Sequence, residues 1–252
     1  MSDSESGRPP SAVGVTGTGA EEIADLVAAA GGNPVVDTPE TVLDADPALD
    51  AVVAGGESAA RAVAVADADA PVLAVDAGRG LCSVSRADLP SAIDRLLAGT
   101  WDVQRRLVLD VTAGERTARS LLDVTLMTSR PARISEYGVE SATDGDVEPF
   151  RADGVVVATP AGSHGYARDA GGPSLSPAVD GGAVVPIAPF AIDQRRWVLD
   201  FPLTLTVERD TPVDLFVDGE RVAAITPGVA VDVRTRARAP FVAVPERTPF
   251  FG

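Results

Sequence analysis

The segment with the clearest chemical potential is a turn of small and polar residues that follows an apolar run. Gly154–Ala158 is apolar, and Thr159-Pro-Ala-Gly-Ser-His-Gly-Tyr166 comes directly after it. Small residues let backbone N–H groups approach an anionic ligand closely, and the ring of Tyr166 could stack on a base. A second glycine pair, Gly171-Gly172, would permit another close approach. A surface turn without a ligand is the alternative that these residues alone leave open.

The first third of the chain alternates short apolar runs with helical patterns. Apolar residues recur at helical spacing over Glu21–Ala30 and Leu89–Leu97, and a further helix is expected at Ser58–Val65. Strands that alternate with helices predict βαβ units and a parallel sheet. The expected strands are Ala12–Val15, Val35–Val36, Ala51–Ala54 and Pro71–Val75.

After Gly99 the chain consists of short β-type runs, with one further helix expected after Ser163. Asp218-Gly219 lies between two apolar runs and predicts a hairpin with a type I′ turn. We therefore predict a fold class of α/β plus β-rich. The expected parts are a disordered tail at 1–10, an α/β domain at 11–99, a β-rich domain at 100–235 and a segment at 236–252 that returns to the first domain.

The composition excludes several classes of site and partner. All 21 basic residues are arginine, so no lysine can serve a P-loop or a Schiff base. Cys82 and His164 are the single cysteine and the single histidine, which excludes a disulfide framework and argues against a metal site built by the protein. The 37 carboxylates give a net charge of −16, which argues against nucleic acid as a partner.

The same acidity favours a halophilic, archaeal source, because salt at about 1 M shortens the Debye length to roughly 3 Å and screens self-repulsion. An acidic protein from an ordinary GC-rich organism is the alternative. The chain has no run of 18 apolar residues, which predicts no membrane span. Its polar start, Met1–Pro10, lacks the apolar core of a signal peptide, so we expect a cytoplasmic protein.

The order of these motifs resembles the NAD kinase family. That family carries Asp-Gly, a strand, Thr-Pro-Thr-Gly-Ser-Thr-Ala-Tyr and then Ala-Gly-Gly-Pro, where this chain has Asp153-Gly154, Thr159–Tyr166 and Ala170–Pro173. Gly55-Gly56-Glu57-Ser58 stands where the family has Gly-Gly-Asp-Gly. The resemblance implies an N-terminal Rossmann-like α/β domain and a C-terminal β-sandwich-type NAD-binding domain. Further likenesses are Pro71–Gly78, Pro186–Phe190 and Asp218-Gly219.

The resemblance implies an enzyme that uses ATP, accompanied by Mg²⁺, to phosphorylate NAD at the adenosine ribose 2′-hydroxyl and form NADP. On this view Glu57 is the catalytic carboxylate that assists the 2′-hydroxyl, and Gly55 and Gly56 contact the phosphates of ATP. The family also implies a homo-oligomer. The residues implied to hold NAD are Asp123, Thr159, Ala161, Gly162, Ser163, His164, Tyr166, Gly171 and Gly172.

The chain departs from the family pattern at positions that carry chemistry. Glu57 is one methylene longer than the family's aspartate, and a displacement of about 1 Å near a reacting centre can cost on the order of 10²-fold in rate. Ser58 replaces a glycine, and Leu122 replaces an asparagine that hydrogen-bonds NAD. A second hypothesis is therefore a catalytically inactive regulatory protein of the same fold that binds NAD(P) or another nucleotide. A third is a kinase for a lipid or sugar, because Leu122 and Phe190 make the site more apolar.

Overall fold

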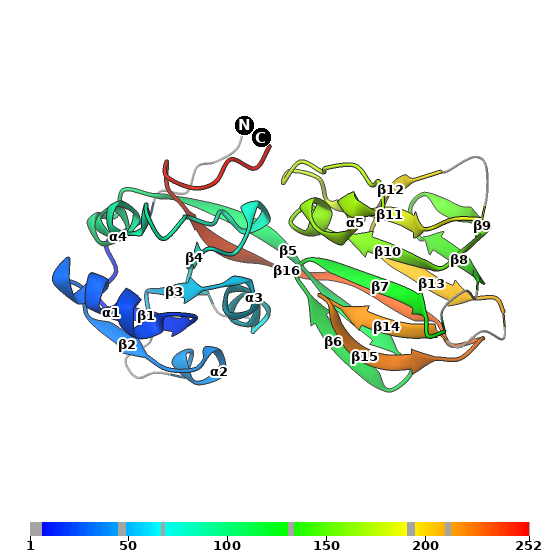
Figure 1. Ribbon diagram of the computed structural model, residues 1–252, viewed down its shortest axis with the longest axis horizontal. Helices are drawn as coiled ribbons and strands as arrows, with labels where there is room; N and C mark the ends of the chain where they lie inside the picture. The colour runs from blue at the N-terminus through cyan, green and yellow to red at the C-terminus, as the bar shows by residue number, and fades with distance from the viewer. Residues whose placement is uncertain are drawn as a thin grey trace. The chain divides into compact units, whose positions relative to one another are not determined.

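The chain folds into two units in a computed structural model (Figure 1). The N-terminal unit comprises Met1–Arg106 and Arg238–Gly252, and the β-rich unit comprises Leu107–Ala237. The structure describes residues 7–44, 49–66, 69–130, 134–190, 195–209 and 213–251. Residues 1–6 of the tail predicted at 1–10 lie outside these ranges, whereas the N–H of Gly7 donates to the carbonyl of Trp101 over 2.8 Å.

A parallel sheet forms the centre of the N-terminal unit. Its strands β1 (Val13–Gly17), β2 (Pro34–Val36), β3 (Ala51–Gly55) and β4 (Val72–Val75) lie in the order β2-β1-β3-β4. The end of β16 (Val231–Ala243) joins this sheet, where Phe241 pairs in parallel with Val72. The strands β3 and β4 are buried along their whole length, which explains why they are uninterrupted apolar runs.

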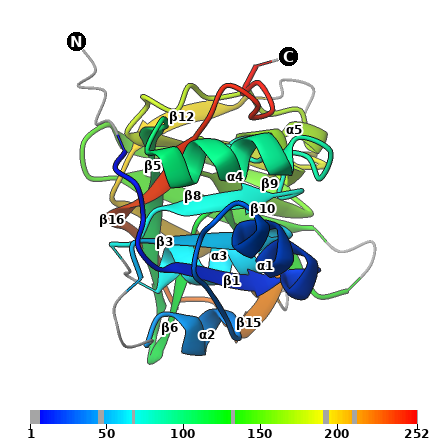
Figure 2. The ribbon, with the colours of Figure 1, turned by 90° about the vertical axis from the view of Figure 1, so that its left-hand side faces the viewer.

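Helices cover both faces of this sheet (Figure 2). The helices are α1 (Ala20–Ala29), α2 (Pro39–Val42), α3 (Glu57–Val65) and α4 (Leu89–Ala98). Ile23 of α1 and Leu96 of α4 share one apolar cluster with Val15, whereas a Cβ on the neighbouring Gly14 would point at Val42 of α2. The predicted helices at α1, α3 and α4 are confirmed to within one residue at each end. The short helix α2 was not predicted.

A six-stranded antiparallel sheet forms one layer of the β-rich unit. Its order is β12-β11-β10-β7-β14-β15, and each pair of neighbours is antiparallel. The strands are β7 (Asp123–Thr128), β10 (Gly154–Ala158), β11 (Gly181–Ile187), β12 (Trp197–Asp200), β14 (Val213–Val217) and β15 (Glu220–Ile225). A 3₁₀ turn at Gly162–His164 and the short helix α5 (Tyr166–Asp169) follow β10.

The second layer of this unit is also antiparallel. It contains β5 (Asp102–Ala113), β6 (Arg116–Ser120), β8 (Ser135–Ser141), β9 (Gly145–Ala152) and β13 (Leu203–Val207). The start of β16 lies between β13 and β5, and β8 and β9 extend the sheet beyond β13.

The core of the β-rich unit lies between these two layers. Val157 and Leu126 of the six-stranded layer share one buried cluster with Tyr137 and Leu205 of the other. The predicted fold class, an N-terminal α/β region followed by a β-rich, sandwich-type domain, is confirmed. The predicted type I′ hairpin is also confirmed, because Asp218 and Gly219 both have positive φ, 49° and 80°. Within the described part of the chain, no helix is long and apolar enough to cross a membrane.

Candidate functional site

The Gly55–Glu57 turn lies at the carboxyl end of β3, between the ends of β1 and β4. Carboxyl ends of parallel strands form one edge of the sheet, where open α/β folds bind their ligands. The N–H of Thr18, after β1, donates to the carbonyl of Gly55 over 2.8 Å. The N–H of Gly56 donates to the carbonyl of Val75, at the end of β4, over 2.8 Å. The turn is therefore held from both neighbouring strands.

Glycine is required in this turn for reasons of space and conformation. A Cβ on Gly55 would lie 2.2 Å from the carbonyl oxygen of Thr18. Gly56 has a φ of 89° and precedes α3, and no side chain caps that helix N-terminus. The N–H of Gly56 is used within the sheet edge, but the absence of side chains at both glycines leaves the uncapped N-terminus of α3, the positive end of its dipole, open to the phosphates of a nucleotide.

Glu57 begins α3 and is exposed at this edge of the sheet. Its Oε2 atom lies 3.8 Å from the position that a Cβ on Gly78 would occupy, so the carboxylate reaches the loop that follows β4. A carboxylate in such a position could orient a hydroxyl group and accept its proton.

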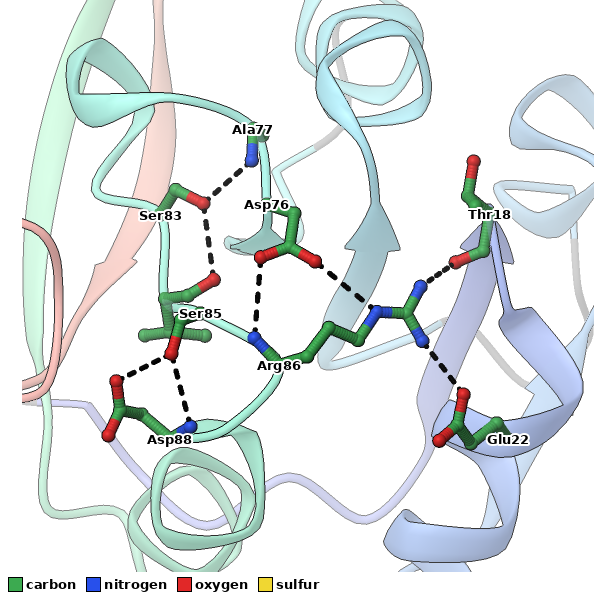
Figure 3. A network of polar contacts seen from close by, with 9 residues as sticks. Thr18, Glu22, Asp76, Ala77, Ser83, Ser85, Arg86 and Asp88 are labelled. Carbon is green, nitrogen blue, oxygen red and sulfur yellow. Dashed lines mark hydrogen bonds and ion pairs between the residues drawn. The ribbon is translucent and has the colours of Figure 1, made fainter.

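The loop after β4 is fixed by a polar network around Asp76 and Arg86 (Figure 3). The Oγ of Ser83 accepts a hydrogen bond from the N–H of Ala77 over 2.8 Å. The backbone N–H of Arg86 donates to Asp76 Oδ1 over 3.3 Å, and its guanidinium contacts Asp76, Glu22 and the carbonyl of Thr18. Asp76 itself has a φ of 49°, a conformation in which aspartate and asparagine are tolerated better than most residues.

In the β-rich unit, the Thr159–Tyr166 segment follows β10 and is braced by its own hydroxyl groups. The Oγ1 of Thr159 donates to the carbonyl of Leu121 over 2.7 Å and accepts from the N–H of Gly162 over 3.2 Å. The Oγ of Ser163 donates to the carbonyl of Pro160 over 2.8 Å and accepts from the N–H of Leu175 over 3.0 Å. Both side chains are fully buried, so these contacts shape the turn from inside.

The turn packs against the loop that precedes β7. A Cβ on Gly162 would lie 2.0 Å from the carbonyl oxygen of Leu122, so only glycine permits this approach. The carboxylate of Asp218 organises the same loop by accepting four hydrogen bonds, from the Oγ of Ser120 and from the N–H groups of Leu121, Leu122 and Asp123, over 2.6–3.0 Å. Asp218 thereby fixes the position of Asp123.

Asp123 and Tyr166 meet at a pocket of about 250 Å³ in the β-rich unit. Tyr166 is 40% exposed, and the carboxylate of Asp123 accepts a hydrogen bond from the Oγ1 of Thr125 over 3.1 Å. Partial burial, followed by the charges of Asp123, Asp153 and Asp169, raises the pKa of the Tyr166 phenol. The pocket therefore combines apolar walls, one carboxylate and a neutral phenol. Its lining residues are Asp123, Thr125, Met127, Tyr166, Phe216 and Gly219.

The other residues predicted to hold NAD lie near this turn. Ala161 is buried and His164 is partly exposed. Gly171 has a φ of 83°, and the N–H groups of Gly171 and Gly172 donate to the carbonyls of Arg168 and Ala167 at the end of α5. This pair therefore closes α5 in the way that glycines commonly close helices.

The structure thus groups the predicted residues by unit. Gly55, Gly56 and Glu57 lie together in the N-terminal unit, and Asp123 and Tyr166 lie together in the β-rich unit. Sequence reasoning missed Met127 and Phe216 as pocket walls and missed the role of Asp218. Only the strand register, which pairs Phe216 with Thr125 and Met127 with Asp214, brings them there.

The described residues contain no group of three or more His, Cys, Asp or Glu side chains that could hold a metal ion. Glu57 is the carboxylate beside the glycine turn, and a carboxylate is a ligand type that Mg²⁺ accepts.

Comparison with known proteins identifies the family. The model of the ATP-NAD kinase C-terminal domain matches residues 122–245. The NAD kinase of Symbiobacterium thermophilum is 33% identical over 235 residues, which are 88% of this chain and 82% of that protein. The chain belongs to the NAD kinase family.

Other NAD kinases match over a shorter span. The one from Methanothermobacter thermautotrophicus is 33% identical over 166 residues, which are 65% of this chain and 56% of that protein. Among solved NAD kinase structures, yeast NADH kinase complexed with NADH has a TM-score of 0.77 at 18% identity and covers 95% of this chain and 85% of its own. An NAD kinase from Archaeoglobus fulgidus in complex with ATP has a TM-score of 0.72 at 20% identity and covers 92% of each chain. These two likenesses show the shared fold.

Proposed function

We propose that this protein is an active NAD kinase, which transfers the γ-phosphoryl group of ATP to the adenosine ribose 2′-oxygen of NAD and releases NADP and ADP. The observation that carries the proposal is the Gly55–Glu57 turn, which places a carboxylate, Glu57, at the carboxyl edge of a parallel sheet. Family membership supplies the substrate class, and the pocket beside Tyr166 supplies a place for a base.

Each unit has its own part in this reaction. The β-rich unit binds NAD, with the Tyr166 ring against the base and Asp123 as an acceptor for an amino or hydroxyl group. The buried hydroxyls of Thr159 and Ser163 contribute by holding the turn rather than by touching the substrate. We propose the partly exposed His164 and the backbone of Ala161 and Gly162 as neighbours of the dinucleotide.

The N-terminal unit supplies the groups for phosphoryl transfer. Glu57 accepts the proton of the 2′-hydroxyl as that oxygen bonds to the γ-phosphorus and the bond to the ADP oxygen breaks. Gly55 and Gly56, which carry no side chains, let the phosphates of ATP approach the N-terminus of α3. Mg²⁺ bound with ATP would neutralise charge on the phosphoryl oxygens.

A catalytically inactive nucleotide-binding regulator is the second candidate. The sequence favours it at two positions, because Glu57 is longer than the family's aspartate and the aliphatic Leu122 stands where the family has an amide. A kinase for another hydroxylated substrate is the third candidate function. Homo-oligomeric assembly and a cytoplasmic location stay predictions.

One experiment separates the first two candidates. The folded protein is incubated with NAD, ATP and Mg²⁺ in molar KCl, and NADP is measured by chromatography. The kinase proposal predicts NADP. If no NADP forms, and the double variant Glu57→Asp with Ser58→Gly does not restore it, the kinase proposal fails. Calorimetric binding of NAD by that same inactive protein would then favour the regulator.

A further inference from the structure

The side chain of Arg86 lies at the carboxyl end of β3. It contacts one residue just after each of the two neighbouring strands, β1 and β4. Its Nη2 donates to the carbonyl of Thr18, and its Nε lies 3.4 Å from Asp76 Oδ2 (Figure 3). Thr18 follows β1 and Asp76 follows β4, and β3 lies between those strands in the sheet. The guanidinium therefore bridges across the strand that carries the Gly55–Glu57 turn.

Both anchors of Arg86 are adjacent to that turn. The carbonyl oxygen of Thr18 that Arg86 binds is the same atom that lies 2.2 Å from the position of a Cβ on Gly55. The N–H of Thr18 also donates to the carbonyl of Gly55 over 2.8 Å. On the other side, Asp76 follows Val75, and the carbonyl of Val75 accepts a hydrogen bond from the N–H of Gly56. A shift of either anchor would move the turn.

The fit of the guanidinium is tight and directional. A Cβ on Gly19 would lie 2.5 Å from Arg86 Nη1, so glycine at this position leaves the space that the guanidinium occupies. Nη1 also donates to Glu22 Oε2 over 3.1 Å. A guanidinium is planar and its donors are fixed relative to one another, so three partners define one orientation in a way that a lysine could not reproduce.

We propose that Arg86 is a positioning residue that holds the Gly55–Glu57 turn in the geometry required for phosphoryl transfer. The proposal rests on the NAD kinase function proposed above. Exposed ion pairs contribute little to global stability, so the effect of Arg86 is local to the turn. A local effect is enough, because misplacement by about 1 Å near a reacting centre can cost on the order of 10²-fold in rate.

The test compares Arg86→Gln with Arg95→Gln. Arg95 is a matched control, because it lies in the same unit and its Nε is 2.7 Å from Glu246 Oε1 in another partly exposed ion pair. Hydrogen–deuterium exchange of the Thr18 and Gly56 amides is followed by NMR without substrates. We expect exchange about tenfold faster in Arg86→Gln, as loss of a hydrogen bond to a charged group implies, and unchanged exchange in Arg95→Gln.

Kinetics supply the second measurement. We expect kcat to fall by roughly 10²-fold in Arg86→Gln while the dissociation constant for NAD stays constant, and Arg86→Lys should recover only part of the loss. If Arg86→Gln does not fold, amide exchange and kcat are both measured on Arg86→Lys instead. Wild-type exchange and wild-type kcat in the Arg86 variant would overturn the proposal. A wild-type protein that forms no NADP would defeat the proposed function instead, and the exchange experiment would still decide whether Arg86 holds the turn.

Discussion

Tyr166 gives the pocket of the β-rich unit an aromatic face and a hydroxyl group. The residue is 40% exposed and lines the pocket together with Asp123, Met127 and Phe216. An aromatic ring that is partly open to solvent can stack on a base and still remain packed from behind. We therefore expect that removing the Tyr166 side chain weakens NAD binding more than removing any other single side chain of this pocket.

We expect Tyr166→Ala to weaken NAD binding by roughly 10–100-fold, because stacking on one base contributes about 1–3 kcal/mol. Tyr166→Phe keeps the ring and should bind NAD within about threefold of wild type, since a net hydrogen bond contributes about 1 kcal/mol or less. Isothermal calorimetry in molar KCl measures both. Equal affinities for the two variants would show that the ring does not contact the base.

The raised pKa of Tyr166 leads to a prediction about pH. Partial burial and the surrounding carboxylates keep the phenol protonated as the pH rises through its usual value of 10.0. NAD affinity should therefore stay flat from pH 7 to pH 10 and match that of Tyr166→Phe over the same range. A loss of affinity below pH 10 that Tyr166→Phe does not share would contradict this assignment.

At the scale of elements, Asp218 connects two parts of the β-rich unit. It lies in the turn between β14 and β15, and its carboxylate accepts the N–H groups of the loop at Leu121–Asp123. Its own N–H donates back to the carbonyl of Asp123 over 2.8 Å. One hairpin therefore sets both the position of Asp123 and the loop on which the Thr159–Tyr166 segment packs.

We expect Asp218→Asn to reduce NAD affinity by at least about tenfold, because an amide offers one acceptor oxygen where the carboxylate offers two, and a lost hydrogen bond to a charged group costs about 1.5–3 kcal/mol. Asp214→Asn is the matched control, since Asp214 lies on the same hairpin but pairs with Arg221 at the surface. Calorimetry and thermal unfolding are compared for both variants. Equal NAD affinities in the two would contradict a role of Asp218 in the site.

The elements with strong local patterns could be predicted from the sequence. The helices α1, α3 and α4 have apolar residues at helical spacing, and the Asp218-Gly219 pair specifies its own turn. The four-residue helix α2 is too short to show a period. The contacts of Asp218 with residues 95–98 positions away, and the pocket walls Met127 and Phe216, depend on strand register, which no local pattern encodes.

At the scale of the whole molecule, the chain returns to complete the unit in which it began. Phe241, Val242 and Val244 are buried, and the latter two belong to the apolar cluster of the parallel sheet. The net charge of −16 is a second property of the whole chain. Ion pairs such as Arg236 with Asp110 offset only part of it, because carboxylates outnumber arginines by 37 to 21.

We expect the melting temperature to rise between 0.1 M and 2 M KCl, by roughly 2–4 °C for each kcal/mol of repulsion that is screened. Differential scanning calorimetry measures this rise. A series in sorbitol at equal osmolality, which changes water activity without screening charge, is the control. A melting temperature that does not depend on KCl would contradict the electrostatic explanation.

We propose that Glu57 acts as the general base in phosphoryl transfer to NAD. The most direct test of this claim is the rate of NADP formation by Glu57→Gln, compared with Glu21→Gln, which alters an exposed carboxylate in the first turn of α1. We predict that Glu57→Gln lowers kcat by about 10²–10⁴-fold with unchanged NAD affinity, as expected for loss of a general base, and that Glu21→Gln retains wild-type kcat. A Glu57→Gln variant that forms NADP at the wild-type rate would contradict the claim.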